Sequence, residues 1–160
     1  MSNFLSFLLI FFVYNNALLA MDNKPYHHHT EGTVIKPEGC PERNYFLNLK
    51  DINIVWLKRD LRLQDHEPMH KAEQAGIPYI IIYLFEPSII EYPDTNLRHL
   101  QFVYHSIKSL NKYLKNYNRC VDVFYSEAIE TFSFINEKFK IQQLFSYQES
   151  GTKITWKRDK

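Results

Sequence analysis

The stretch Ile54–Arg62 reads IVWLKRDLR, and it sets the pattern that the rest of the chain follows. The apolar run Ile52–Trp56 is typical of a short strand that is buried on both faces. Charged residues follow at once, and Asp65 is placed to cap a helix that runs to Ala75 and ends at Gly76. We therefore expect a buried strand, a charged loop and then a helix.

The alternation of strand and helix patterns continues to residue 147. Apolar runs predict three further strands, and apolar positions spaced three and four residues apart predict two further helices between them. The expected strands are Tyr79–Phe85, Val121–Tyr125 and Gln143–Tyr147, and the helices are expected after Pro93-Asp94 and from Ser126. This order predicts an α/β fold, a flavodoxin-like or Rossmann-like parallel sheet with helices on both faces.

The sheet is expected to lack its last strand. A Rossmann-like sheet has the strand order 3-2-1-4-5, and the sequence supplies only four strands. The fourth strand would then be an exposed edge that carries Leu144 and Phe145, and such edges pair with other chains. We therefore expect self-association, or a downstream chain that covers this edge.

Residues 1–50 differ from the domain that we expect over residues 51–160. Residues 1–20 are a hydrophobic leader or a spurious upstream extension, because the apolar run Phe4–Tyr14 has the length of a signal-peptide core but is too short to span a bilayer. Residues 21–50 are polar and rich in turn-forming residues, which predicts a flexible linker. We expect a cytoplasmic protein with no membrane span, or an exported protein if the leader is a true signal peptide.

Histidines and cysteines give no clear metal site. His27, His28 and His29 are consecutive, whereas zinc ligands must converge on one point, so a solvated stretch is the simpler interpretation. Cys40 and Cys120 share no metal-like spacing, and two reduced thiols are the expectation for a cytosolic protein. The formal net charge of +1 gives no support for a strongly basic, nucleic-acid-binding face.

Ligands of open α/β sheets bind beyond the carboxyl ends of the strands. The loop after the first strand, residues 57–65, has no glycine, which disfavours a dinucleotide-binding loop and a phosphate-binding P-loop. This loop instead contains several charged side chains. Asp60 and Arg62 are expected mainly in a salt-bridge net that joins strand to helix, and Arg59 either belongs to that net or faces the ligand crevice.

The stretch Ile54–Arg62, followed by Asp65 and His66, resembles the opening signature of the photolyase/cryptochrome family. That signature has an aromatic residue, one or two basic residues, Asp-Leu-Arg, and then Asp followed by Asn or His. The second strand is also similar, because the family ends it in Glu-Pro or Asp-Pro, and here Glu86-Pro87 follows Phe85.

Two later segments resemble one bacterial branch of the same family. Residues 92–103 are similar to the start of its next helix, through Tyr-Pro-Asp, Arg-His and Phe-Val. Residues 145–159 are similar to its loop after the fourth strand. That loop usually contains His-Glu-Glu-Thr-Gly, from which Tyr147, Gln148 and Ser150 depart. The resemblance covers about residues 52–160.

The resemblance implies a division of labour. An antenna chromophore, a folate or a deazaflavin, would absorb light at the edge of this domain and pass energy to FAD in a helical domain that the resemblance does not cover. That domain would also bind DNA and would be supplied by a downstream chain. The chain alone would be an inactive part of a light-driven pyrimidine-dimer lyase (deoxyribodipyrimidine photolyase) or of a cryptochrome photoreceptor.

By matching to the family, five residues become candidates for the antenna pocket. They lie after the first strand, near the end of the second and after the fourth: Arg59, Tyr83, Leu84, Gln148 and Glu149. Tyr83 and Leu84 are also explained as buried strand residues. No catalytic residue and no metal ligand is expected. The alternatives are a stand-alone flavodoxin-like binding module and a non-functional gene fragment.

Overall fold

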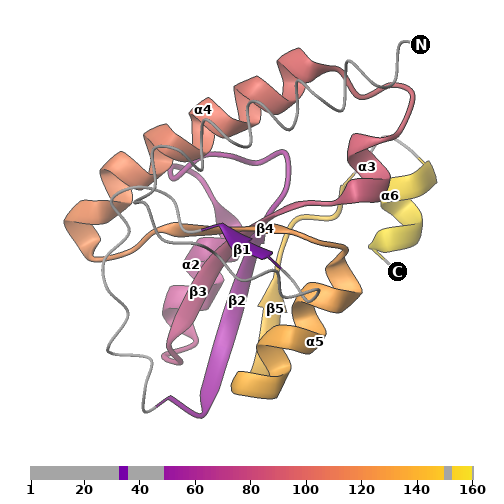
Figure 1. Cartoon of the computed structure of the whole chain (residues 1–160). Helices are drawn as coiled ribbons and strands as arrows, with labels where there is room; N and C mark the ends of the chain where they lie inside the picture. Colours follow the sequence, from indigo (N-terminus) through magenta and orange to yellow (C-terminus); the bar gives the residue numbers. More distant parts are fainter. Residues whose placement is uncertain (1–32, 36–48, 150–152, 160) are drawn as a thin grey trace, which may run out of the picture.

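The computed structural model describes residues 33–35, 49–149 and 153–159 (Figure 1). The predicted leader, His27–His29 and Cys40 lie outside these residues. So does most of the predicted linker.

Four parallel strands form the centre of the sheet, as predicted. They are β2 (Asp51–Leu57), β3 (Tyr79–Phe85), β4 (Val121–Tyr125) and β5 (Lys140–Phe145). Their order is β4-β3-β2-β5, which is the Rossmann order 3-2-1-4 for the first four parallel strands. The last strand was predicted three residues too late, because Lys140 and the two glutamines that follow Ile141 hide its start from a hydrophobic pattern.

A fifth strand was not predicted. Residues Thr33–Ile35 form β1, which pairs antiparallel with β4, Ile35 lying opposite Val123. These three residues fall within the stretch expected to be a linker. Three residues are too few to show a strand period, so only the pairing partner reveals them.

The three predicted helices are present in the predicted order: α2 (Glu67–Gln74), α4 (Leu97–Leu114) with the 3₁₀ turn η2 (Lys115–Tyr117), and α5 (Ala128–Lys138). A short helix, α3 (Pro87–Ile90), was not predicted, and α6 (Lys153–Arg158) follows β5. The first residues of the predicted helices depend on local capping. The N-cap of α2 is His66 rather than Asp65, which has a positive φ of 50°. The N-cap of α5 is Glu127 rather than Ser126. Gly76, at φ 66°, follows the end of α2 as expected.

Two apolar layers hold the helices to the sheet. One layer joins Ile54, Trp56 and Ile82 to α5 through Ile135. The other joins alternate strand residues, Val55 among them, to α2 and α4. Neighbouring strand residues therefore face opposite helices, which confirms helices on both faces (Figure 1).

The strand β5 lies at the edge of the sheet and is less buried than the other strands. Its burial alternates poorly, and Leu144 is 46% exposed, whereas β2 is buried from Ile52 to Leu57. Self-association through this edge remains a prediction.

The cysteine prediction was wrong. Cys120, just before β4, is disulfide-bonded and 5% exposed, not a reduced thiol. The only other cysteine of the sequence is Cys40, outside the described residues. Spacing along the sequence does not reveal such a bond, because a disulfide depends on distance in space.

Candidate functional site

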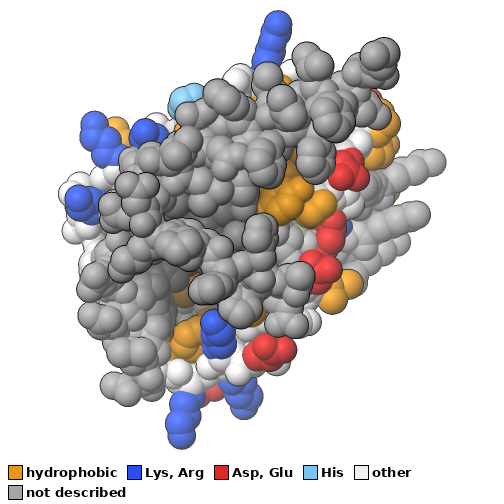
Figure 2. Space-filling view, viewed as in Figure 1, with side chains coloured by type: hydrophobic (Ala, Val, Ile, Leu, Met, Phe, Trp, Pro, Cys, Tyr) orange, Lys and Arg blue, Asp and Glu red, His pale blue; other side chains and the backbone are white. Residues whose placement is uncertain are grey.

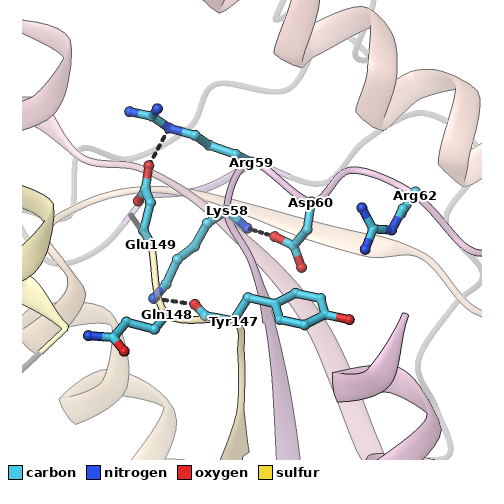
Figure 3. A pocket seen from close by; sticks show the side chains of 7 residues that line it. All are labelled: Lys58, Arg59, Asp60, Arg62, Tyr147, Gln148 and Glu149. Atoms are coloured by element: carbon cyan, nitrogen blue, oxygen red, sulfur yellow. Dashed lines mark hydrogen bonds and ion pairs between the residues drawn. The ribbon is translucent and has the colours of Figure 1, made fainter. Parts of the chain in front are cut away.

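The loops that follow β2 and β5 meet at the carboxyl edge of the sheet, because these two strands are parallel neighbours. Between them lies an open hollow of about 330 Å³ (Figure 3). Its lining is almost wholly charged or polar: Lys58, Arg59, Asp60, Arg62, Tyr147, Gln148 and Glu149.

Asp60 fixes the shape of the first loop. Its Oδ1 accepts a hydrogen bond from the Lys58 amide at 2.8 Å, and its Oδ2 lies 2.6 Å from Nε2 of His66. His66 Nδ1 accepts from the Met69 amide at 3.2 Å and caps α2, so Nε2 carries the proton that is donated to Asp60. Burial alone would raise the pKa of Asp60, but the hydrogen bonds from His66 and the Lys58 amide hold it below its usual value.

Tyr147 closes the side of the hollow next to α2. Its hydroxyl accepts a hydrogen bond from the Glu67 amide at 2.9 Å, and its ring meets the ring of His66 edge-on at 5.4 Å. The guanidinium of Arg62 lies 5.8 Å from the centre of the Tyr147 ring. The aromatic ring of Tyr147 and the guanidinium of Arg62 therefore lie next to each other at the opening of the hollow.

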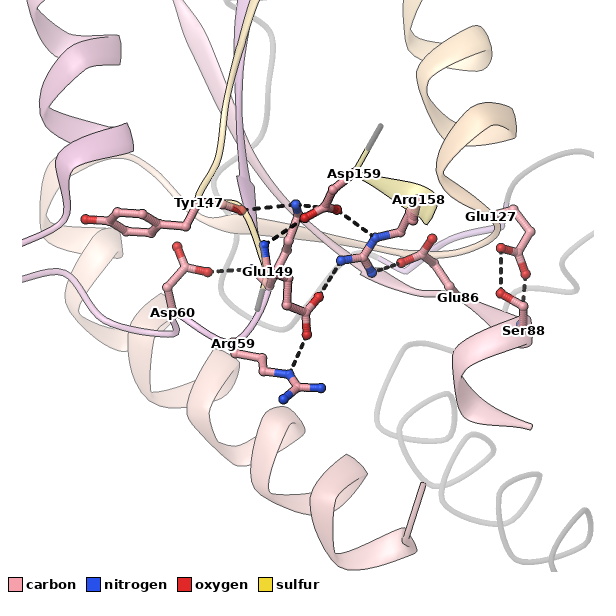
Figure 4. Close-up of polar contacts among 10 residues, drawn as sticks. Arg59, Asp60, Glu86, Ser88, Glu127, Tyr147, Glu149, Arg158 and Asp159 are labelled. Atoms are coloured by element: carbon pink, nitrogen blue, oxygen red, sulfur yellow. Dashed lines mark hydrogen bonds and ion pairs between the residues drawn. The ribbon is translucent and has the colours of Figure 1, made fainter. Parts of the chain in front are cut away.

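Glu149 closes the opposite side, where it accepts from two arginines (Figure 4). Arg59 reaches it from the loop after β2, and Arg158 reaches it from α6. Arg158 also pairs with Glu86, directly after β3. The Arg59 side chain is 67% exposed, whereas that of Glu149 is 8% exposed, so the arginine extends from a buried anchor into the solvent.

Five charged residues form a buried array that we call the carboxyl-end charge cluster: Lys58, Glu86, Glu149, Arg158 and Asp159. Lys58 Nζ lies 2.7 Å from Asp159 Oδ1 and donates to the Tyr147 carbonyl at 3.1 Å. The Lys58 ammonium and the Arg158 guanidinium lie 4.4 and 4.8 Å from the centre of the Trp56 ring. The cluster thus ties α6 to the ends of three strands.

Burial and pairing shift the acidities of this cluster in different directions. Burial raises the pKa of Glu86 above its ordinary value, although Arg158 lies beside it. Burial would also raise the pKa of Asp159, but hydrogen bonds from Lys58 and the Glu149 amide hold it below its usual value. Burial acts to lower the pKa of Arg158, and the carboxylates of Glu86 and Glu149 raise it overall. The cluster contains two basic and three acidic side chains, and Arg59 adds a third basic side chain through Glu149.

The sequence model of the DNA photolyase family matches residues 53–159, which is more than half of the chain. This chain belongs to the DNA photolyase family. The matched residues contain the whole hollow and the carboxyl-end charge cluster.

Two proteins and one solved structure are similar to parts of this chain. A cryptochrome DASH of Synechocystis is 44% identical over 34 residues, which are 21% of this chain and 7% of that protein. A deoxyribodipyrimidine photo-lyase of Buchnera aphidicola is 27% identical over 100 residues, or 58% of this chain and 20% of that protein. The crystal structure of a Synechocystis cryptochrome shares the fold, with a TM-score of 0.62 at 20% identity over 70% of this chain and 24% of that one. The chain thus spans a quarter or less of each relative.

The structure brings together three of the five antenna candidates of this photolyase-family domain. Arg59, Gln148 and Glu149 line the hollow. Leu84 does not, because it is 6% exposed in the layer between the sheet and α5. Tyr83 points to the other layer and meets Phe85 edge-on at 5.0 Å, and burial with the nearby Glu149 carboxylate raises the pKa of its hydroxyl.

The structure also adds residues that sequence reasoning did not assign to the site. Arg158 pairs with Glu149 on one side of the hollow, and Tyr147 bonds the Glu67 amide on the other. His66 fixes the loop after β2 through its hydrogen bond to Asp60. The salt-bridge net predicted for Asp60 and Arg62 is formed differently: Asp60 is hydrogen-bonded to His66, and Arg62 donates to the Asp65 carbonyl at 3.2 Å. A signal was available for His66, since a residue just before a helix that begins Glu-Pro is placed to cap it.

Neither a metal-ligand cluster nor a membrane-spanning helix occurs in the described residues. Within 33–35, 49–149 and 153–159, no group of three or more histidine, cysteine or acidic side chains converges as metal ligands would. In the same part of the chain, no helix is both long enough and apolar enough to cross a bilayer.

Proposed function

We propose that this chain is the antenna module of a photolyase-type or cryptochrome-type blue-light flavoprotein. The hollow at the ends of β2 and β5 would receive one edge of a planar chromophore, a folate or a deazaflavin. FAD and the DNA lesion would be bound by a helical domain in a downstream chain. That domain decides between pyrimidine-dimer repair and photoreception, and the whole would act in the cytoplasm.

The observation that carries this proposal is the pairing of Arg59 with a buried carboxylate at the mouth of the hollow. Nε of Arg59 contacts Glu149, and the two terminal nitrogens of the guanidinium point away from Glu149 (Figure 3). A guanidinium held in this way presents its remaining N–H donors in a fixed plane, which suits the carbonyl or carboxylate edge of a heterocycle.

The remaining lining fits a flat, polar ligand. Tyr147 offers an aromatic ring, Arg62 a second cation, and Gln148 an exposed amide that both donates and accepts. The volume of about 330 Å³ is at the lower end of the range for ligand sites. The hollow would therefore hold one ring system of the chromophore, and a second protein surface would cover the remainder of the chromophore. The bound chromophore would supply light absorption. The residues of this chain would bind it, orient it and exclude water from one side.

A titration of the full chain with a folate or a deazaflavin, followed by chromophore absorbance and fluorescence, tests this proposal. The variant Arg59→Ala should weaken binding about tenfold, because one charged hydrogen bond contributes about 1.5–3 kcal/mol. Glu149 keeps Arg158 in that variant, so the fold should be intact by circular dichroism. The matched control Arg98→Ala removes an exposed arginine of α4 and should bind normally.

Two outcomes would contradict the proposal. Saturable binding that is the same in Arg59→Ala and in the unmodified chain would place the ligand elsewhere. Unfolding of Arg59→Ala would make Arg59 a purely structural member of the charge cluster. The alternative of a stand-alone binding module outside this family is not favoured, because the family match spans the domain.

A further inference from the structure

The outer surface of α4 differs from the rest of the molecule in its charge. From Leu97 to Arg119 the sequence contains no aspartate or glutamate. Arg98, Lys108, Lys112 and Lys115 all lie on this segment, on a chain whose formal net charge is only +1. Positive charge is therefore concentrated on one helix and compensated elsewhere.

The exposed side of α4 carries two parallel stripes. The inner side of the helix, with Ile107, Leu110 and Leu114, is buried in the sheet layer. At 100° per residue, one stripe on the outer side is cationic and the other is aromatic. On α4 the cationic stripe contains Arg98, His105, Lys108 and Lys112, and the aromatic stripe contains Phe102 and Tyr113. The 3₁₀ turn η2 adds Lys115 and Tyr117 directly beyond the helix.

Neither stripe is used by the described part of the chain. Phe102, Tyr113 and Tyr117 are 70%, 64% and 73% exposed. The four cations Arg98, Lys108, Lys112 and Lys115 form no ion pair with any described residue, although Arg119, just beyond the helix, pairs with Glu73 at 3.1 Å. In Figure 2, lysine, arginine and histidine side chains project along the margin where Figure 1 places α4.

We propose that the outer surface of α4 binds single-stranded nucleic acid. The cationic stripe would follow the phosphates, and the flat rings beside it would stack on unpaired bases. This combination of a positive track and exposed aromatic rings is how strands are bound without regard to sequence. The 18 residues of α4 give a track of about 27 Å at 1.5 Å per residue.

Two other polyanionic partners fit the surface less well. A helix that binds a membrane surface inserts its apolar face, and that face of α4 is already buried against the sheet. Duplex nucleic acid would meet the cations, but its bases are stacked on each other and are not available to the rings. The surface is also distinct from the hollow, because no residue of α4 is among the residues that line the hollow.

The test is fluorescence anisotropy of the full chain with a labelled oligothymidylate at several salt concentrations. The triple variant K108Q/K112Q/K115Q should weaken binding at least tenfold. It should also make the slope of log affinity against log salt shallower by about 2, since each phosphate contact on a single strand contributes about 0.7. The matched control K50Q/K138Q/K140Q removes the same charge from exposed lysines outside α4, before β2, at the end of α5 and at the start of β5, and should bind as the unmodified chain does.

The aromatic stripe is tested separately. The variant F102L/Y113L keeps large apolar side chains but removes two flat rings, so affinity should fall about tenfold while the salt slope stays constant. The variant K108R/K112R/K115R should bind as tightly as the unmodified chain, because it keeps the charge.

Three results would overturn the proposal: no saturable binding at low salt, an equal loss in the control lysine variant, or binding to a duplex of the same length as tight as to the strand. Vesicles of anionic lipid that bind the chain and compete with the strand only when the rings are intact would instead assign the surface to membranes.

Discussion

Basic residues occur in two settings in this molecule, and the settings differ in burial. In the carboxyl-end charge cluster, Lys58 and Arg158 have side chains that are 6% and 12% exposed, and each contacts a carboxylate. On α4, Lys108 and Lys112 are exposed and have no carboxylate partner among the described residues. The same side-chain chemistry therefore stabilises the fold in one place and is available to a partner in the other.

The difference follows from the free energy of removing a charge from water. A buried charge is tolerated only with a partner, and removing that partner leaves an uncompensated ion. An exposed charge is already solvated, so its removal changes stability little. Substitutions in the charge cluster should therefore lower the free energy of unfolding far more than substitutions of the exposed lysines of α4.

The largest effect is expected for Arg158→Met. It leaves Glu86 without its arginine partner and Glu149 with Arg59 alone. We expect the free energy of unfolding in urea to fall by roughly 3 kcal/mol or more, as for other broken buried pairs. A loss below about 1 kcal/mol would mean that α6 does not anchor the carboxyl edge.

A smaller effect, dependent on pH, is expected for Asp159→Asn. The folded-state pKa values of Asp60 and Asp159 lie below the unfolded value of about 4. Their contribution is fully present above about pH 4 and is lost as the pH falls through the folded-state values. Glu86 has the opposite sign, because its raised pKa favours the protonated, folded form at low pH.

Thermal melts of Asp159→Asn between pH 2 and pH 7 test this expectation. Its Tm should fall less steeply with acid than that of the unmodified chain, and the exposed control Asp94→Asn should follow the unmodified chain. Parallel curves for Asp159→Asn and the unmodified chain would contradict the assignment of this pH dependence to Asp159.

The third effect concerns the loop that shapes the hollow. His66→Ala removes both the cap of α2 and the hydrogen bond to Asp60. Loss of a helix cap lowers stability by about 1 kcal/mol. His66→Asn restores a side chain that can cap the helix and should recover most of the loss, and no recovery would mean that the ring packing against Tyr147 matters more.

The smallest effect is expected for the triple variant K108Q/K112Q/K115Q on α4. Its urea-unfolding free energy should change by less than about 0.5 kcal/mol for each substitution, because exposed lysines without partners contribute little. A large loss would show that these lysines stabilise the fold, and the contrast between the two settings would fail.

Much of the fold could be predicted, because hydrophobic spacing reports which side chains face the core. The positions of β2, β3 and β4 and the order of the helices followed from that spacing alone. The strand β5 was displaced, since its first residues are polar at an exposed edge. The strand β1 was missed, because its three residues are defined only by pairing with β4.

Local patterns of residue types were enough to predict the family, the α/β class and the charged, glycine-free loop at the carboxyl edge. Which charges meet depends on the folded chain. Arg59 and Arg158 meet through Glu149, which lies 90 residues beyond Arg59 in the sequence, whereas the lysines of α4 have no carboxylate partner in the part of the chain that the structure describes. The physical reason is that ion pairing depends on distance in space, and parallel strands bring together ends that are far apart in the chain.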